Sequence, residues 1–333
     1  MPTEAYRTQV SRSLPMLCAL VLLAVTVRAA EEAASTPRER LAKLAVELKA
    51  HPERFKYSDI IVAVAREGYP EVDKDNGAAF ERELDRLAAQ LKERLEDANS
   101  GRAKVLRLNE IVVEKAKLRV APEATGEMDP DKERTEPYFG PGVLQVHQGV
   151  CLGLTQIYLC LGERAGLPLA PVRAPEHIFV HYDDGKYAVD IECTDSGRLF
   201  NRADLAQHFE PPADGQPKVY FEPVGKLDLL ADMLNALAWF SALKKLPRPL
   251  SPEDNVALGK LCVELSPNDF ETWDTLAEVY RSCGKHQDAL ETERKALTFR
   301  PKYAVENATT KKKDSFWKKR LEQFEAEATK IDK

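Results

Sequence analysis

The sequence predicts an α+β fold: a helical N-terminal region, then a cysteine-bearing helix against a small antiparallel sheet, then a short helical repeat region. Three observations carry this prediction. Apolar residues recur every three or four positions over much of residues 37–117. Two short strand-like segments flank the turn signal Asp183-Asp184-Gly185. A 34-residue period marks the C-terminal part of the chain.

The composition is that of a globular protein of about two domains. The chain has 333 residues, of which 44% are hydrophobic and 31% are charged. Its formal net charge is -6, and basic residues are interleaved with acidic ones. Because no basic stripe stands out, we expect no nucleic-acid partner.

The first 29 residues have the pattern of a secretory signal peptide. Arg7 and Arg12 precede an apolar run over residues 14–27, and Val27-Arg28-Ala29 places small residues at a cleavage site. The run is shorter than the roughly 20 residues of a transmembrane span. We therefore expect an exported protein, periplasmic or secreted, with membrane association only if the segment is not cleaved.

The cysteines do not form a metal-binding pattern. Cys18 would be lost with the signal peptide, which leaves five: Cys151, Cys160, Cys193, Cys262 and Cys283. An odd number in an oxidising compartment leaves at least one thiol unpaired within the chain. No CxxC pair and no Cys/His cluster of zinc spacing occurs. We expect neither a metal nor another cofactor.

The N-terminal region, residues 37–120, is expected to be helical. Turn signals at Gly68-Tyr69-Pro70 and Asn99-Ser100-Gly101 separate its apolar periodic segments. The predicted helices cover residues 37–48, 57–65, 80–95 and 104–117. A Pro-, Gly- and acid-rich loop is predicted over residues 121–142, at the start of a core that extends to residue 215.

The C-terminal region, residues 226–330, carries the internal period and follows a turn-rich linker at residues 210–217. Trp239 and Trp273 are 34 residues apart, as are Pro267 and Pro301. This is the period of tetratricopeptide repeats, and the second copy matches their template well, whereas the first is degenerate. A capping helix is expected over residues 315–330. Such repeats are a candidate surface for a protein partner.

The strongest catalytic candidate is Cys151. The turn Gly149-Val150-Cys151 leads directly into an apolar helix over residues 151–165, so Cys151 lies at the helix N-terminus. Free backbone amides and the helix dipole stabilise a thiolate there, which is the nucleophilic form of cysteine. The competing interpretation is a buried structural cysteine, which is how we interpret Cys160 in the middle of the same helix.

His177 is the candidate base. It stands at the start of the first of two predicted strands, directly before residues 178–182; the second strand covers residues 186–192. A two-residue turn at Asp184-Gly185 would place His177 opposite Glu192. Asp190 would then be a diagonal neighbour on the same sheet face. His181 shares this face but lies nearer the turn. A carboxylate beside a histidine orients the ring. We choose Asp190 as this carboxylate and keep Glu192 as the alternative.

The order of a helix-borne cysteine, a strand histidine and an aspartate on the next strand resembles the transglutaminase-like (papain-related) superfamily. The closer resemblance is to its SirB-type branch, whose members often end in tetratricopeptide repeats. It rests on Gly149-Val150-Cys151, Gly166-Leu167-Pro168, Pro175-Glu176-His177-Ile178-Phe179-Val180 and Val189-Asp190, and on Ala63 to Asp73 in the helical region. Asp190 is followed by Ile191-Glu192 where the family usually has Asp-Pro, which leaves the third catalytic residue open.

The resemblance implies a transglutaminase-like core and cysteine-dependent acyl transfer on a protein or peptide substrate. Cys151, His177 and Asp190 would form the triad, and hydrolysis is the expected outcome, with cross-linking as a second one. Gln145 would be a candidate oxyanion donor, as a glutamine is in papain-like enzymes. Many SirB-type members lack the cysteine, so the alternative is an inactive scaffold that binds a protein or peptide partner.

Overall fold

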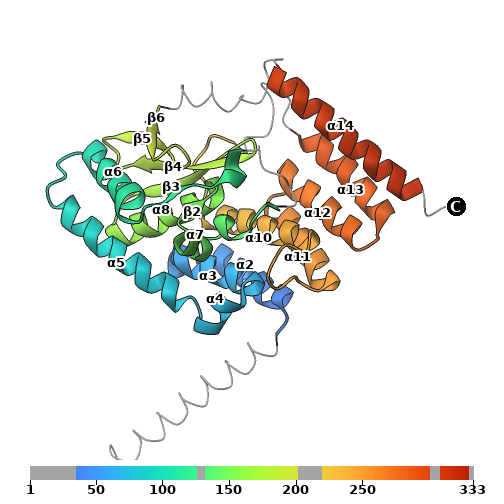
Figure 1. Cartoon of the computed structure of the whole chain (residues 1–333), viewed down its shortest axis with the longest axis horizontal. Helices are drawn as coiled ribbons and strands as arrows, with labels where there is room; N and C mark the ends of the chain where they lie inside the picture. The colour runs from blue at the N-terminus through green and yellow to red at the C-terminus, as the bar shows by residue number, and fades with distance from the viewer. Residues whose placement is uncertain (1–34, 126–131, 202–219, 301–307, 330–333) are drawn as a thin grey trace, which may run out of the picture.

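The computed structural model describes residues 35–125, 132–201, 220–300 and 308–329 (Figure 1). The predicted signal peptide and the predicted linker at 210–217 lie outside these residues. Within the described ranges, no helix combines the length and the apolar character needed to cross a membrane.

The N-terminal region is helical, as predicted. Thr36 caps the first helix in a reciprocal hydrogen-bonded box with Glu39, and the Ser100 side chain caps α6. The predicted helix over 104–117 is α-helical only in its first part, because the chain then widens into a π-helical turn in which the Ala116 amide donates to the Ile111 carbonyl. The elements are α2 (Pro37–Ala50), α3 (Tyr57–Gly68), α4 (Pro70–Asp75), α5 (Ala78–Leu95), α6 (Gly101–Asn109) and the π-helix Glu110–Lys115.

The predicted loop over 121–142 contains more structure than expected. A short parallel pair, β1 (Arg119–Val120) and β2 (Gln148–Gly149), brackets it. Between the strands, Gly142 must be a glycine, because a Cβ there would lie 2.4 Å from the Glu136 carbonyl oxygen. Gly142 thus allows two backbone segments to pack closely here, where the sequence predicted an open loop. The helical turns are the 3₁₀ segments Pro122–Thr125 and Glu136–Tyr138, and α7 (Gly140–Val146).

The sheet has four antiparallel strands in chain order, β3-β4-β5-β6. Two of these strands were predicted, whereas β3 and β6 were not; β3 contains Pro171 and β6 is only three residues long. α8 (Cys151–Ala165) contacts β3 and β4 on one side and α3 and α5 on the other (Figure 1). The predicted pairing of a cysteine-bearing helix with a small antiparallel sheet is confirmed. The strands are β3 (Leu169–Ala174), β4 (His177–Asp183), β5 (Ala188–Glu192) and β6 (Arg198–Phe200).

The predicted register of the β4–β5 hairpin is wrong by two residues. Asp183 pairs with Ala188, so the turn contains four residues instead of two. The Asp184 side chain explains the longer turn, because it accepts hydrogen bonds from the backbone amides of Lys186 (3.0 Å) and Tyr187 (2.9 Å). A shift of two leaves every side chain on its predicted face and changes only which residues lie opposite each other.

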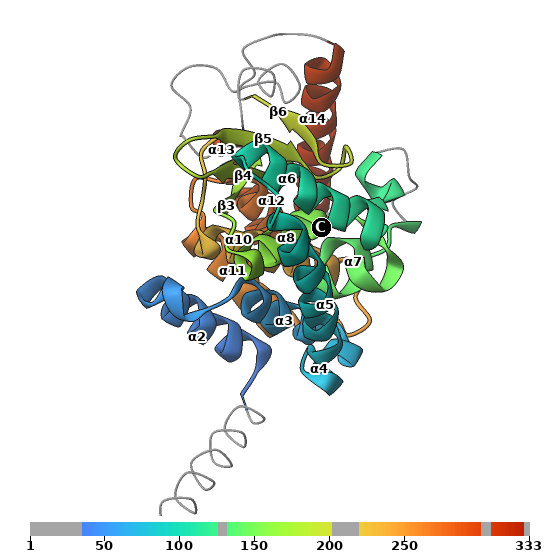
Figure 2. The same cartoon turned by 90° about the vertical axis from the view of Figure 1, so that its left-hand side faces the viewer.

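The C-terminal region is helical, and it shares a core with the rest of the chain. One cluster of buried apolar side chains runs from Leu41 in α2 to Val279 in α12. These helices lie together on one side of the molecule, to the right of the sheet in Figure 1, and Figure 2 shows the molecule from its opposite side. They are α10 (Lys226–Ala242), α11 (Pro252–Leu265), α12 (Phe270–Ser282), α13 (His286–Phe299) and α14 (Ala308–Thr329).

The spacing of these helices agrees only in part with the predicted repeat. α11 and α13 begin at Pro252 and His286 and end at Leu265 and Phe299. The first residues of the two helices are therefore 34 positions apart in sequence, and so are their last residues. α10, in contrast, begins earlier than this offset from α12 would place it. The assignment to tetratricopeptide repeats stays a prediction.

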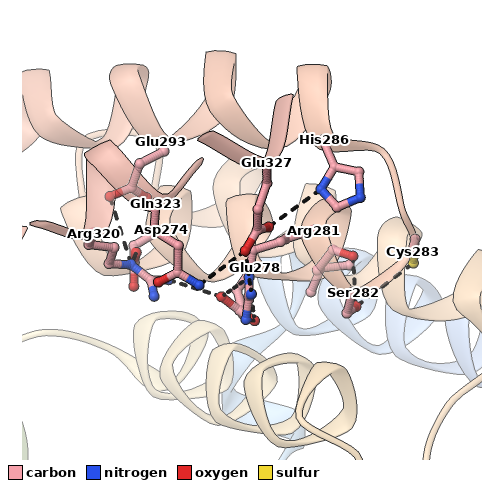
Figure 3. A network of polar contacts seen from close by, with 11 residues as sticks. Asp274, Glu278, Arg281, Ser282, Cys283, His286, Glu293, Arg320, Gln323 and Glu327 are labelled. Atoms are coloured by element: carbon pink, nitrogen blue, oxygen red, sulfur yellow. Dashed lines mark hydrogen bonds and ion pairs between the residues drawn. The ribbon is translucent and has the colours of Figure 1, made fainter. Parts of the chain in front are cut away.

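A buried charge network attaches the last helix (Figure 3). Arg320 of α14 reaches Asp274 at 2.7 Å and Glu278 at 3.3 Å, both on α12. It also lies 3.8 Å from Glu293 of α13, whose side chain is fully buried. Burial, together with the neighbouring Asp274 carboxylate, raises the pKa of Glu293 to about 8 from an ordinary value of 4.5. Between about pH 4.5 and pH 8, the folded protein therefore holds a proton on Glu293 that the unfolded chain releases.

Glu293→Gln should change the pH dependence of stability. The raised pKa means that Glu293 supports folding below pH 4.5 and loses this contribution as the pH rises to about 8. Gln resembles the protonated acid, so the variant should gain on the wild type with rising pH in this window. The gain is at most about 1.4 kcal/mol per pH unit. Urea unfolding at pH 5, 6.5 and 8 measures it.

The matched control is Glu291→Gln, since Glu291 lies exposed on the same helix. Its difference from the wild type should not vary with pH. Parallel stability curves for wild type and Glu293→Gln would contradict the assignment of a proton to Glu293.

Candidate active site

Cys151 is the first residue of α8, and the chain around it packs tightly. The Val150 amide donates to the Pro137 carbonyl at 3.0 Å. Gly153, in the first turn of α8, has to be a glycine, because a Cβ there would lie 2.1 Å from the same carbonyl oxygen. The short 3₁₀ segment at 136–138 therefore lies directly against the first turn of α8. This contact holds the Cys151 side chain at the surface of the core, partly exposed.

His177 lies at the start of β4 and contacts Cys151. A two-residue turn joins β3 to β4, with Glu176 in the left-handed region at φ 58° and His177 paired with Ala174. The His177 Nε2 atom lies 2.8 Å from Glu192 Oε2. The ring also makes a side-chain hydrogen bond with Cys151. Because Glu192 occupies Nε2, Nδ1 is the nitrogen left for the sulfur.

The charges around His177 favour its protonated form. Burial of the ring opposes protonation, but the Cys151 side chain and then Glu192 outweigh it and raise the pKa of His177 to about 10. Burial alone would raise the pKa of Glu192, yet hydrogen bonds from His177 and Thr194 lower it below its usual value. The arrangement thus favours an imidazolium at His177, between the Cys151 sulfur and the Glu192 carboxylate.

Asp190, the first choice from the sequence, binds the other histidine of the strand. Its Oδ1 atom lies 2.6 Å from His181 Nδ1, and its side chain is buried. The two-residue shift in register explains this pairing, because it places His181 opposite Asp190 and makes Glu192 the diagonal neighbour of His177. The structure brings Cys151, His177 and Glu192 together, with Asp190 next to His181.

Gln145 is not at this site. It lies exposed on α7, and the described residues that line the cleft at Cys151 do not include it. The buried glutamine of this region is Gln156, which accepts a hydrogen bond from the Gly140 amide at 2.7 Å and donates to the Tyr138 carbonyl at 3.0 Å. Gln156 therefore supports the loop that packs on α8.

Cys151 and His177 line a cleft of about 290 Å³. The C-terminal helices form much of its wall, which the sequence did not indicate, because no local pattern relates α10 and α12 to Cys151. Trp239, noticed only for its repeat spacing, is one of the lining residues. The others from these helices and the residue before α12 are Asp232, Asn235, Ala236, Phe240, Asp269, Glu271, Asp274 and Thr275.

The remaining cysteines are less suited to nucleophilic chemistry. Cys160 and Cys262 are fully buried, and burial raises the pKa of both thiols. Burial also raises the pKa of Cys193. Cys283 is partly exposed but lies at the end of α12, outside the cleft lining. Among the five cysteines that the structure describes, Cys151 is the one that is partly exposed and contacts His177.

Comparison with known families identifies the part of the chain that holds this site. Residues 78–235 match the model of the family described as the transglutaminase-like superfamily (Transglut_core2). The chain therefore contains a transglutaminase-like domain, which extends from α5 into α10 and includes Cys151 and His177. A search of curated proteins found no match.

Among solved structures, the chain is similar to menin, in a crystal structure described as revealing the binding site for Mixed Lineage Leukemia (MLL) protein. The identity is 14%, the TM-score is 0.35, and the similarity covers 76% of this chain and 69% of menin.

Glu192→Gln and Asp190→Asn separate the two candidate carboxylates. Glu192→Gln removes a charged hydrogen bond to His177, so the pKa of His177 should fall from about 10 by roughly one to two units. Asp190→Asn should leave it close to the wild-type value, since Asp190 contacts His181. Histidine NMR titration of both variants measures the change. A larger shift in Asp190→Asn would reverse the assignment.

Proposed function

We propose that this protein catalyses cysteine-dependent acyl transfer, with hydrolysis of an amide or peptide bond as the main outcome. The observation that carries the proposal is the chain of contacts from Cys151, at the N-terminus of α8, to His177 and on to Glu192. These three residue types in this order can activate a thiol and return its proton to a leaving group.

The reaction follows the acyl-enzyme route. The Cys151 thiolate attacks the substrate carbonyl, and the new oxyanion accepts a hydrogen bond from the Cys151 backbone amide at the helix N-terminus. The imidazolium of His177 gives its proton to the leaving amine as the C–N bond breaks, which leaves a thioester. His177, now neutral, takes a proton from water as the water oxygen attacks the thioester. Cys151 leaves as a thiolate with a carboxylic acid product.

Glu192 is the positioning residue for His177 in this proposal. Its second oxygen, Oε1, accepts hydrogen bonds from the Thr194 amide at 2.9 Å and the Thr194 hydroxyl at 2.6 Å. The carboxylate is therefore held at both ends, which fixes the ring that it contacts. Asp190, in contrast, already has His181 as its partner.

The proposal also includes a narrower family, a repeat organisation and a cellular location. Placement in the SirB-type branch is supported by the motifs around Cys151 and His177, and the tetratricopeptide organisation by the 34-residue offset of α11 and α13. Export to a periplasm or beyond is supported by the pattern of residues 1–29. The alternative, a non-catalytic scaffold for a protein or peptide, is supported by a cleft walled by α10 and α12.

The reactivity of Cys151 distinguishes the enzyme from the scaffold. With iodoacetamide at pH 6.5, Cys151 should be alkylated at least about tenfold faster than Cys283, because the positive charge of His177 lies beside the attacking sulfur. Cys283 is the internal reference, since it is also partly exposed. Mass spectrometry of peptides measures both rates in one sample.

His177→Ala should bring the two rates together, and Cys151→Ala should abolish hydrolysis of any peptide that the wild type cleaves. Equal rates for Cys151 and Cys283 in the wild-type protein would favour the scaffold.

A further inference from the structure

The cleft at Cys151 is strongly acidic. Among the described residues that line it, one is arginine, none is lysine and six are acidic: Glu133, Glu176, Asp232, Asp269, Glu271 and Asp274. The arginine, Arg173, is already bound by Asp232 at 2.6 Å and lies 3.6 Å from Asp228. It is therefore engaged with protein carboxylates rather than available to an anionic ligand. The charge of the cleft favours a cationic substrate.

Four of the six carboxylates have a cation from the protein. Their ion pairs are Glu133 with Lys245 (2.9 Å), Glu176 with Lys313 (3.2 Å), Asp232 with Arg173 (2.6 Å) and Asp274 with Arg320 (2.7 Å).

Asp269 and Glu271 differ from these four. Within the described part of the chain, neither makes an ion pair. Each is instead held by a backbone amide: Asp269 accepts from the Glu271 amide and Glu271 from the Glu176 amide, both at 3.1 Å. These amides orient the two carboxylates without supplying a full positive charge.

These two carboxylates are close to each other and to the nucleophile. Asp269 is 5% exposed. Burial and then the negative charge of Asp269 raise the pKa of Glu271, and Cys151 also contributes to this effect. Two carboxylates with little solvent repel one another and favour a cation between them or beside them. Arg173 offsets part of the charge of Asp269, but among the described residues no cation pairs with Glu271, and the adjacent space is the open cleft.

A second wall of the cleft is aromatic. Tyr138, Trp239 and Phe240 line it, and Tyr138 and Phe240 pack edge to face with their ring centroids 4.6 Å apart. Aromatic faces attract ammonium and guanidinium groups, and they also accommodate the methylene stems of Lys and Arg. These rings come from different elements than Asp269 and Glu271. Arg320 already lies over the Trp239 ring, 5.5 Å from its centroid, so Tyr138 and Phe240 are the rings that favour a substrate cation.

Asn235 adds an independent sign of a ligand. It lines the cleft, and its Oδ1 atom is buried without a hydrogen-bond partner among the described residues. A buried acceptor without a donor is costly. A substrate N–H group in the cleft would satisfy it.

We propose that this cleft selects substrates with a cationic side chain, a lysine ammonium or an arginine guanidinium, beside the carbonyl that Cys151 attacks, and that Asp269 and Glu271 determine this specificity. The inference rests on the proposed acyl transfer for the identity of the reacting carbonyl. The recognition of the cation itself does not require a reactive thiol.

The test measures binding to full-length protein carrying Cys151→Ala, which cannot turn over the ligand. The ligands are capped dipeptide amides that differ in one residue: lysine, arginine, the neutral isostere norleucine, and glutamate. Isothermal titration calorimetry at low ionic strength should show at least about tenfold tighter binding of the lysine or arginine peptide than of the norleucine peptide. The preference should shrink as salt is added, since exposed parts of the cleft are screened.

Asp269→Asn and Glu271→Gln, added singly and together, should reduce this preference to about twofold or less. Asn still caps α12 at Asp269, and Gln can still accept from the Glu176 amide, so both variants retain the local hydrogen bonds. Glu264→Gln is the matched control, because Glu264 is exposed on α11 outside the cleft. If the double variant does not fold, each single variant still gives the ratio of lysine-peptide to norleucine-peptide affinity.

Equal binding of the lysine and norleucine peptides would overturn the inference, as would a preference that survives both substitutions. Either result leaves acyl transfer intact if Cys151 is still alkylated faster than Cys283. Cation-selective binding together with an unreactive Cys151 would support the specificity of the cleft and reject catalysis.

Discussion

The burial of α8 is the constraint on which the rest of the structure depends. Residues 152–162 of this helix are all buried, with the sheet on one side and α3 and α5 on the other. A helix enclosed in this way cannot slide or rotate without opening the core. Its first turn is also fixed from outside by the backbone at Pro137, which Gly153 allows to approach. The position of Cys151 is thus set by packing of the whole N-terminal half.

The sequence predicted those parts of the site that depend on local signals. The turn Gly149-Val150-Cys151 and the stop Gly166-Leu167-Pro168 define α8, and the structure has it over Cys151–Ala165. His177 was assigned to a strand by its flanking residues, and it does begin β4. Strand face was also predictable, because it depends only on whether two residues are an even number apart.

What failed depended on side-chain chemistry within a turn and on long-range packing. Asp184 extends the hairpin turn through its own hydrogen bonds, which shifts the pairing by two residues. As a result Glu192, and not Asp190, contacts His177, while Asp190 contacts His181. Asp269 and Glu271 are almost a hundred residues beyond His177, so no spacing rule connects them to Cys151. Gln145 was proposed by analogy with the glutamine of papain-like enzymes, but it lies exposed on α7. The buried glutamine is Gln156 of α8, which is hydrogen-bonded to Gly140 and Tyr138.

The hairpin between β4 and β5 has a consequence for how this chain can vary. The two histidines of β4 and the two acids of β5 lie on one face, and each histidine contacts one of the acids. A change of turn length by one residue would turn β5 over and remove both acids from both histidines. A register shift of two keeps both acids on this face, but its effect depends on direction: one shift places Glu192 directly opposite His177, and the other places Glu192 opposite His181 and leaves His177 without an acid of β5. Only one of the two even shifts therefore keeps a carboxylate beside the histidine that contacts Cys151.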